Sequence, residues 1–151
     1  MINEFKGDYR WLSNFEAVTI TIDGVSYPSV EHAYMSYKSN DPEWKKFCMD
    51  ANNTAGDVKK KSREVKLVDN WDNLKFTVMS LCLTKKYEQE PFRSRLIKTG
   101  TQNIVEGNYF GDTIWGVDLK YTPNIGENHL GRMIMKVRED LIIRYGTAEG
   151  Q

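Results

Sequence analysis

The stretch from Ala17 to Lys38 places a tight hairpin directly before a helix, and this order limits the folds that are open to the chain. Between residues 17 and 22, apolar residues alternate with threonines, which is the pattern of a strand with one buried face. Asp23-Gly24 is a strong two-residue turn signal, and Val25–Tyr27 returns as the second strand. Ser29 can accept hydrogen bonds from the free backbone amides of a helix that begins there. We therefore expect a small antiparallel sheet that leads straight into a helix.

Helical patterns account for most of the remaining chain. They cover Glu43–Ala51, Asp57–Lys66, Asp72–Tyr87, Pro91–Lys98 and Asn128–Tyr145. In the helix of residues 72–87 we expect a broad apolar surface, and Gln102–Glu106 is a short strand candidate. The residues of this surface are Leu74, Val78, Leu81 and Cys82, with Phe76, Met79 and Leu83. The sequence shows no internal repeat and no linker. We expect a compact, helix-rich α+β fold, with a single domain over residues 1–146 and a disordered tail over residues 147–151.

The charge balance and the cysteines narrow the function classes. The 151 residues include 21 Lys+Arg and 21 Asp+Glu, so the formal net charge is zero and the overall basic footprint of a nucleic-acid binder is missing. No apolar run approaches the length of a membrane span, and we expect no membrane partner. Cys48 and Cys82 lack metal-ligand spacing, which favours a reducing, cytoplasmic compartment. His32 and His129 are the only histidines, and without a paired ligand motif we expect neither a metal nor another cofactor.

The helix that follows the hairpin carries the first candidate site. Glu31, Tyr34, Met35 and Lys38 fall at i, i+3, i+4 and i+7, so a helix would present them on one face. A carboxylate and an amine one helical repeat apart, beside aromatic rings, can form a small reactive pocket. The alternative is that Glu31 is an ordinary first-turn glutamate, which the helix dipole favours, and that Lys38 is an exposed lysine on a solvated face.

Two loops and one charged segment are further candidates. In Trp11–Phe15, a turn can aim the side chains of Ser13 and Asn14 at a ligand, or the two aromatic residues can simply anchor the turn. In Gly107–Gly116, three glycines bracket an aspartate and a tryptophan, which suits either a site loop or a structural loop. Asp57–Lys66 is rich in lysine and is either a solvated helix face or a patch for phosphates.

Taken together, these stretches resemble the NADAR family, also called YbiA-like. The order and spacing of the matching pieces carry the resemblance, which runs from about residue 5 to residue 143. The pieces are Trp11-Leu12-Ser13-Asn14-Phe15, Ser29-Val30-Glu31-His32-Ala33-Tyr34 with Lys38, Trp71-Asp72 with Met79, Lys86-Tyr87, Leu96 through Thr99-Gly100, Val105-Glu106, Asp112 with Trp115-Gly116, Gly126 through Asn128, Leu130-Gly131, Met135 and Arg138. Two positions depart from the family pattern: Tyr87 stands where Phe is usual, and Met35 where Gln is frequent.

The resemblance implies a compact, helix-rich α+β domain that cleaves N-glycosidic bonds. Two substrate classes are attached to the family: ADP-ribose on guanine, in nucleic acid or nucleotides, and the ribosylamino-pyrimidine phosphate intermediates of riboflavin biosynthesis. The partners expected from it are a small-molecule nucleotide or ribosylated base and, as a further option, ADP-ribosylated DNA or RNA.

The resemblance also implies site residues, whose chemistry agrees with the reaction. The expected catalytic residues are Glu31, Asp112 and Lys38, and the expected substrate-binding residues are Trp71, Ser13, Asn14, Tyr34, Trp115 and Asn128. Cleavage develops positive charge on the sugar and negative charge on the leaving base, so one carboxylate can stabilise the sugar or activate water while a second acid protonates the base. Lys38 can bind a phosphate, or attack the sugar as an amine if burial lowers its pKa.

Two other function classes stay open at this point. The same pocket can belong to a non-catalytic module that binds ADP-ribose or a nucleotide. The segment Asp57–Lys66 can bind nucleic acid, although the zero net charge favours this only as an accessory to the removal of ADP-ribose from DNA or RNA.

Overall fold

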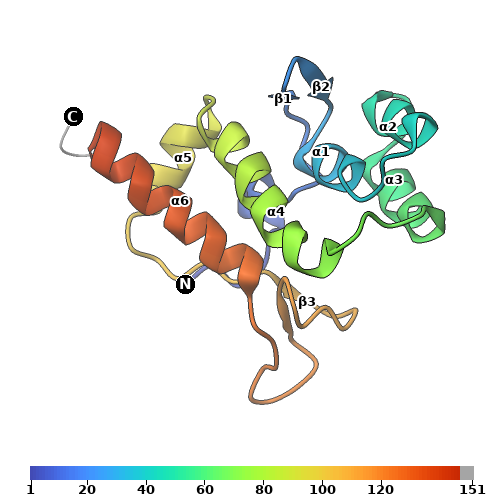
Figure 1. The fold of residues 1–151 in the computed structure, drawn as a ribbon. Coiled ribbons are helices and arrows are strands. Elements are labelled where there is room, and N and C mark those ends of the chain that lie inside the picture. Colours follow the sequence, from blue (N-terminus) through green and yellow to red (C-terminus); the bar gives the residue numbers. More distant parts are fainter. Residues whose placement is uncertain (147–151) are drawn as a thin grey trace. The chain divides into compact units, whose positions relative to one another are not determined.

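The computed structural model describes residues 1–146 and divides the chain into two units (Figure 1). Residues 14–86 form the internal unit, and residues 1–13 together with the described part of residues 87–151 form the terminal unit. Helices predominate and the strands are short, so the α+β class with a small N-terminal hairpin is confirmed. The expected single domain over residues 1–146 stays a prediction, and the expected disordered tail lies outside the described residues.

The hairpin of the internal unit forms as its sequence predicts. β1 (Ile20–Ile22) pairs antiparallel with β2 (Val25–Tyr27), with Ile22 opposite Val25. Asp23 and Gly24 have φ angles of 52° and 78°, and a type I′ turn requires positive φ at both central residues. Ile20 and Ile22 are buried while Thr21 between them is exposed, which gives the sheet the single buried face that the alternation indicates.

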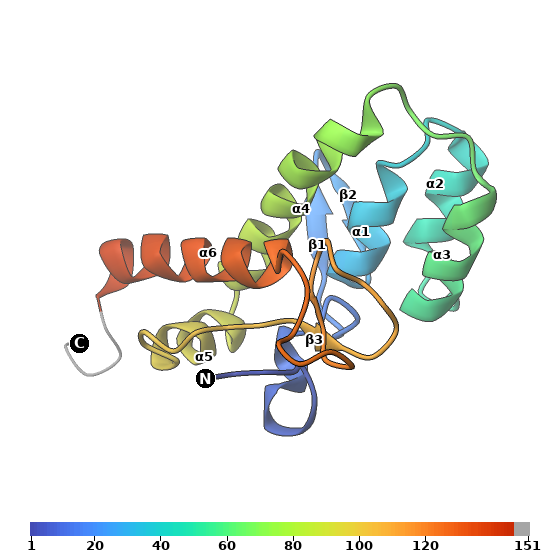
Figure 2. The same ribbon diagram turned by 90° about the horizontal axis from the view of Figure 1, so that it is seen from below.

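Capped helices fill the rest of the internal unit. They are α1 (Val30–Ser36), α2 (Pro42–Met49), α3 (Ala55–Lys61), the 3-10 helix η2 (Ser62–Glu64) and α4 (Trp71–Tyr87), whose last residue already belongs to the terminal unit. Asp41 caps α2, and Thr54 caps α3 in a capping box with Asp57. Figure 2 shows α1 between the hairpin on one side and α2 and α3 on the other, and α1 contacts all of them. Val30 and Ala33 on α1 are fully buried, which fixes this helix in the core of the unit.

The terminal unit consists of two helices, a 3-10 turn and a few extended segments. Its elements are η1 (Gly7–Leu12), α5 (Phe92–Lys98), β3 (Gly107–Asn108), β4 (Val117–Asp118) and α6 (His129–Tyr145). β3 and β4 pair in parallel, and α5 and α6 lie side by side in Figures 1 and 2. Leu130, Ile134 and Leu141 form the buried stripe of α6. No helix of residues 1–146 is both long and apolar enough to cross a membrane.

The strand expected at Gln102–Glu106 is wrong. Ile104 forms only an isolated bridge with Ile2, supported by a hydrogen bond from the Ile2 amide to Asn103 O of 2.8 Å. The pairing stays short because the N-terminal segment turns into the 3-10 helix at Gly7. The strand of this region, β3, instead begins at Gly107, inside the stretch that the sequence suggests as a loop.

Candidate active site

Glu31 lies in the first turn of α1 and is buried, with 6% of its surface exposed. The predicted cap is confirmed, since the Ser29 side chain accepts a hydrogen bond of 3.1 Å from the His32 amide. The Glu31 amide donates to Asn14 O at 3.0 Å, which ties the start of the helix to the turn at Asn14, on the other side of the hairpin in the sequence. A buried carboxylate is costly unless its surroundings stabilise it, so this glutamate is not the solvated first-turn residue of the alternative interpretation.

His32 holds the start of α1 in place. Its Nδ1 lies 2.6 Å from Ser29 Oγ, and its Nε2 lies 2.7 Å from the carbonyl oxygen of Asn53. Because a carbonyl only accepts, Nε2 must carry the proton, and a neutral ring then accepts at Nδ1. Both ring nitrogens of His32 are therefore occupied by the protein, which makes this histidine a clamp for the helix rather than a metal ligand.

Lys38 lies just after α1, because the helix ends at Ser36, earlier than the shared helical face of residues 31–38 implies. Its ammonium donates to Ser62 Oγ at 3.3 Å, and its carbonyl accepts from the Val68 amide at 2.9 Å. Burial lowers the pKa of Lys38, the Glu31 charge opposes this shift, and the Arg63 charge adds to it. The structure therefore brings Lys38 within electrostatic range of Glu31 and favours the neutral amine more than an exposed lysine would.

Two aromatic rings of the internal unit, one of them on α1 between Glu31 and Lys38 in the sequence, pack against each other. Tyr34 lies on α1 and Trp71 begins α4, with ring centroids 5.3 Å apart and planes tilted by 45°. They are 5% and 7% exposed. This geometry is a favourable tilted aromatic contact, and it gives α1 and the start of α4 a common apolar wall.

Asn14 contributes an unsatisfied polar atom at the same turn. Its Nδ2 donates weakly to the sulfur of Met79 at 3.5 Å, whereas its Oδ1 is fully buried and has no hydrogen-bond partner. A buried acceptor without a donor is uncommon in folded proteins, and a ligand is one way to satisfy it. Ser13, the neighbouring candidate, ends η1 in the terminal unit, where its amide donates to Arg10 O at 2.9 Å.

The remaining candidates, Asp112, Trp115 and Asn128, belong to the terminal unit. Asp112 Oδ1 accepts hydrogen bonds from the amides of Ile114 and Trp115 at 3.1 and 2.9 Å. One carboxylate oxygen of Asp112 thus holds the turn that leads to Trp115.

Asn108 and Asn128 give the loop of residues 107–116 its shape. Asn108 is 4% exposed; its Oδ1 accepts from the Asp112 amide at 3.1 Å and its Nδ2 donates to Asp112 O at 2.9 Å. Asn128 Oδ1 accepts from the Glu106 amide at 3.0 Å, and its Nδ2 donates to Ile104 O at 2.9 Å. Both amide atoms of Asn128 are therefore used by the backbone, so the geometry favours a supporting role for it, and substrate binding by Asn128 stays a prediction.

A Cβ atom at Gly116 would collide with the backbone oxygen of Glu106 as well as with its carboxylate, and because the backbone cannot move aside as a side chain can, the close approach requires glycine.

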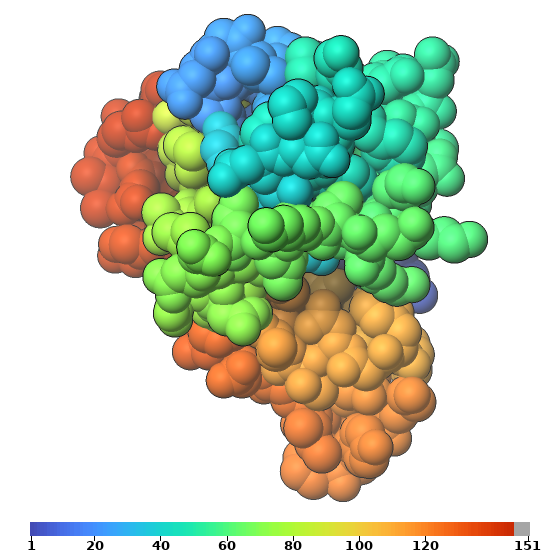
Figure 3. Space-filling model, turned by 45° about the vertical axis from the view of Figure 1, so that its right-hand side comes forward, coloured from blue at the N-terminus to red at the C-terminus, as the bar shows by residue number. Residues whose placement is uncertain are grey.

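The charged segment of residues 57–66 forms α3 and η2, on the surface that Figure 3 shows in green beside α2. Lys61 pairs with Glu64 at 3.7 Å on the exposed surface. Lys59 lies 6.0 Å from the ring of Phe15, next to Asn14 in the chain. The segment thus combines a solvated face with an inward residue, Ser62, that contacts Lys38, and phosphate binding by its lysines stays a prediction.

Sequence reasoning missed one titratable group of the internal unit, Lys86. Lys86 is fully buried near the end of α4, and burial lowers its pKa to about 7, against the opposing charge of Glu16. Met79, Leu83 and Lys86 follow one another at helical spacing on the buried face. Of the predicted apolar surface, Met79, Cys82 and Leu83 are buried, whereas Leu74 and Leu81 are 43% and 39% exposed. Lys86-Tyr87 is one of the pieces of the family resemblance, but no local signal predicts that Lys86 is buried, because Lys85-Lys86 looks like an ordinary pair of cations at a helix end.

Neither the two cysteines nor any cluster of possible metal ligands adds a reactive group to the described residues. Cys48 and Cys82 are free and buried, and burial raises the pKa of each thiol to about 12, so both are unreactive. Residues 1–146 contain no group of three or more His, Cys, Asp or Glu side chains that could hold a metal ion.

These features define a helix-rich α+β protein whose internal unit joins a buried carboxylate to a partly buried lysine and a pair of packed aromatic rings. The model of the NADAR domain matches residues 2–142, and the chain therefore belongs to the NADAR family. The relatives include N-glycosidase YbiA of Escherichia coli strain K12, which is 30% identical over 138 residues, covering 90% of this chain and 84% of the relative. A riboflavin biosynthesis protein of Vibrio vulnificus is 30% identical over 137 residues, covering 89% of this chain and 36% of that protein.

The fold agrees with this assignment. The NMR structure of Escherichia coli YbiA superimposes with a TM-score of 0.79 at 28% sequence identity, covering 95% of this chain and 88% of that one. The resemblance that the sequence motifs indicate is confirmed over nearly the whole chain.

Proposed function

We propose that this protein hydrolyses the bond between C1 of a ribose and the nitrogen of a base. Family membership makes the chain a hydrolase that acts on N-glycosyl bonds, since its curated relatives carry the name N-glycosidase. The observation that carries the proposal for this chain is the buried Glu31 within electrostatic range of Lys38, whose pKa burial lowers. Perturbed ionisable groups of this kind are typical of catalytic sites.

Glu31 is the group that stabilises the sugar in this proposal. Departure of the base leaves positive charge on C1 and on the ring oxygen, and a carboxylate that is shielded from water stabilises this charge strongly. The fixed start of α1 holds the Glu31 side chain in place before the substrate arrives, so little reorganisation is needed during the reaction.

Lys38 is the nucleophile in this proposal, because a lowered pKa increases the fraction of neutral amine. The Lys38 nitrogen forms a bond to C1 as the bond from C1 to the base breaks, and the base takes a proton from an acid. Loss of a proton from nitrogen and opening of the sugar ring, whose oxygen is protonated, give a Schiff base. Water then adds to C1 and releases the lysine and the sugar. The competing role, a charged anchor for phosphate, requires the protonated lysine.

Adding borohydride during turnover is expected to leave a sugar-derived adduct on Lys38, because borohydride reduces a Schiff base to a stable amine. Peptide mapping by mass spectrometry locates the adduct. Lys38→Arg removes the adduct and most of the activity, whereas Lys60→Arg, a matched change on the exposed face of α3, retains both. Full turnover without an adduct, together with an active Lys38→Arg protein, would contradict the nucleophile and leave the phosphate role.

Asp112 is the second acid of this proposal: in its protonated form, the carboxyl oxygen that does not hold the loop donates its proton to the leaving base, and Asp112 becomes a carboxylate. Trp71, Tyr34 and Trp115 provide surfaces for stacking, and Ser13 and Asn14 provide hydrogen bonds to the ribose or the base.

Asp112→Asn is expected to lower base release by about 100-fold, since an amide cannot replace a general acid. The amide oxygen of asparagine can still accept from the Ile114 and Trp115 amides, so the loop keeps its shape. Asp118→Asn is the matched control, because Asp118 Oδ1 holds a similar turn by accepting from the Lys120 amide at 2.9 Å. Equal activity of the two variants would show that the Asp112 carboxyl group has only a structural role.

The substrate is a ribosylated base from one of two classes: ADP-ribosyl-guanine in DNA or as a nucleoside, or a ribosylamino-pyrimidine phosphate. The relative from Vibrio vulnificus, by its name, supports the second class. A panel of these substrates, with chromatography of the released base, tests the proposal. Release from at least one substrate is expected. A folded protein that binds the panel but releases no base would instead support a binding module.

A further inference from the structure

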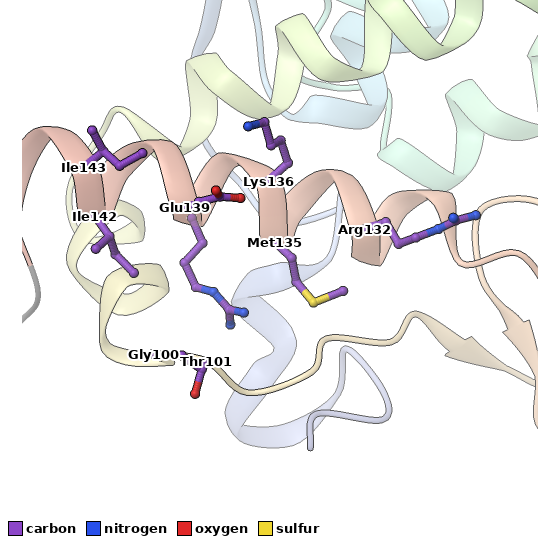
Figure 4. Close-up of a pocket in the computed structure, with 9 residues that line it drawn as sticks. Gly100, Thr101, Arg132, Met135, Lys136, Glu139, Ile142 and Ile143 are labelled. Atoms are coloured by element: carbon purple, nitrogen blue, oxygen red, sulfur yellow. The ribbon is translucent and has the colours of Figure 1, made fainter.

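The terminal unit contains a cavity of about 520 Å³ between α6 and the chain that follows α5. Gly100 and Thr101 line one side of it, and Met135, Arg138 and Ile142 of α6 line the other. In Figure 4, Met135 and Ile142 extend from α6 toward the side on which Gly100 and Thr101 lie. This volume lies within the range of sites that bind small ligands in proteins.

Arg138 is the distinctive residue of this cavity, because its side chain is charged and only 7% exposed. Its Nη1 donates to Thr99 Oγ1 at 3.0 Å and to Gln102 O at 2.8 Å, which ties the end of α5 to α6. Among the described residues, no carboxylate forms an ion pair with Arg138. A buried guanidinium without an anionic partner is costly, and the two neutral acceptors compensate only part of this cost.

The protein leaves one edge of the Arg138 guanidinium unused. The hydrogen bonds to Thr99 and Gln102 occupy Nη1, so the N–H groups of Nε and Nη2 have no acceptor in residues 1–146. These two nitrogens form the planar fork that binds two oxygens of a phosphate or a carboxylate at once. They are not among the fully buried unpaired atoms, so they keep some exposure, and Arg138 lines the cavity.

The charges at the rim favour a phosphate over a carboxylate. Lys136 is paired with Asp140 at 3.6 Å, so this pair adds little net charge. Arg132 also lines the cavity and forms no ion pair, whereas Glu139 adds one negative charge. With Arg138 the cavity therefore carries a net positive charge, and a doubly charged anion gains more from it than a singly charged one. Met135 and Ile142 offer an apolar wall to the rest of the ligand.

We propose that this cavity is a second ligand site, which binds a small phosphomonoester with its phosphate on the Nε and Nη2 edge of Arg138 and its organic part against Met135 and Ile142. The site does not depend on the proposed hydrolysis, because all its residues belong to the terminal unit and none of them is a proposed catalytic group. A ligand bound in this cavity would contact both the end of α5 and α6, and it would stabilise the terminal unit because it binds only the folded protein.

Titration of the full chain with phenyl phosphate, followed by amide chemical shifts in NMR spectra, tests the site. Saturable shifts at the end of α5 and in α6 are expected, with a Kd of about 1 mM or tighter. Benzoate, which has the same ring but a carboxylate, is expected to bind about tenfold more weakly because it carries one charge fewer. No saturable shift with phenyl phosphate would overturn the proposal, and tighter binding of benzoate would overturn the assignment to phosphate.

Variants test whether phenyl phosphate binds to the Nε and Nη2 edge of Arg138. Arg138→Lys keeps the charge but removes the bidentate geometry, and the affinity for phenyl phosphate is expected to fall about tenfold or more. Arg144→Lys, on the same helix but outside the cavity, is the matched control and is expected to bind normally. If Arg138→Lys fails to fold, Thr101→Glu at an exposed position on the cavity wall places a carboxylate there, and Thr101→Val is its neutral control. Unchanged affinity in Thr101→Glu, or in a folded Arg138→Lys protein, would contradict the site.

Discussion

Glu31→Gln is expected to lower base release by about 100- to 10,000-fold while the protein stays folded. Glutamine has the size and shape of glutamate, so it fits the same buried place at the start of α1, and the cap from Ser29 does not involve the Glu31 side chain. The variant loses the negative charge that stabilises the developing cation on the sugar. Steady-state rates of base release, with far-UV circular dichroism as the check on folding, measure the effect.

Glu43→Gln is the matched control for this experiment. Glu43 also lies in the first turn of a helix of the internal unit, but it is exposed and pairs with Lys46 at 3.6 Å on the surface. Its replacement is expected to leave the rate unchanged, because an exposed ion pair contributes little to stability or reactivity. Near-normal turnover by a folded Glu31→Gln protein would exclude Glu31 as a catalytic residue.

The second large effect concerns the pH dependence of stability and arises from Lys86. Burial lowers the pKa of Lys86 from 10.5 to about 7 in the folded protein. Between these values the unfolded chain binds a proton that the folded protein has lost, so the free energy of unfolding increases as the pH rises. From pH 7 to pH 8.5 this increase amounts to about 1.5 kcal/mol. Well below pH 7 both states bind the proton, and the cost of burying the charge is present in full.

Urea unfolding at pH 7 and pH 8.5 measures this dependence. Lys86→Met is expected to reduce the pH-dependent rise by about 1.5 kcal/mol, since methionine has no proton to lose. Lys85→Met, one residue earlier and only half buried, is the control that keeps the rise. Above about pH 8.5, ionisation of the unfolded-state thiols of Cys48 and Cys82 opposes the effect, so the comparison ends there. The same pH slope in Lys86→Met and in the unmodified protein would show that Lys86 is not the group responsible.

The parts of the fold that follow from local interactions were predictable from the sequence. The turn at Asp23-Gly24 requires two positive φ angles, and the residues at those positions adopt them readily. The caps at Ser29 and Thr54 are also local, because each side chain bonds an amide three residues later. The bounds of α4 agree with the prediction to within one residue, since the helical pattern is long.

The parts that depend on distant partners were not predictable. Lys86 is buried because of the face on which α4 packs, and an apolar pattern that surrounds much of the helix does not define that face. β3 and β4 pair over only two residues each, which is too short for an alternation to reveal. In the candidate site, chemistry and resemblance identify Glu31 and Lys38 in the sequence, but only the fold shows that Glu31 is buried and that the pKa of Lys38 is lowered.

The hydrogen bond between His32 Nε2 and the carbonyl oxygen of Asn53 has a consequence for how this protein can evolve. The acceptor is a backbone atom, so every amino acid at position 53 offers it, although the Asn53 side chain also helps to hold the connection by donating to Phe47 O at 2.9 Å. An insertion or deletion between α2 and α3 would instead move the carbonyl away from the ring and release the helix that carries Glu31. The connection between these two helices is therefore constrained in length by the His32 contact, while Asn53 and Thr54 constrain its composition through their own side-chain hydrogen bonds.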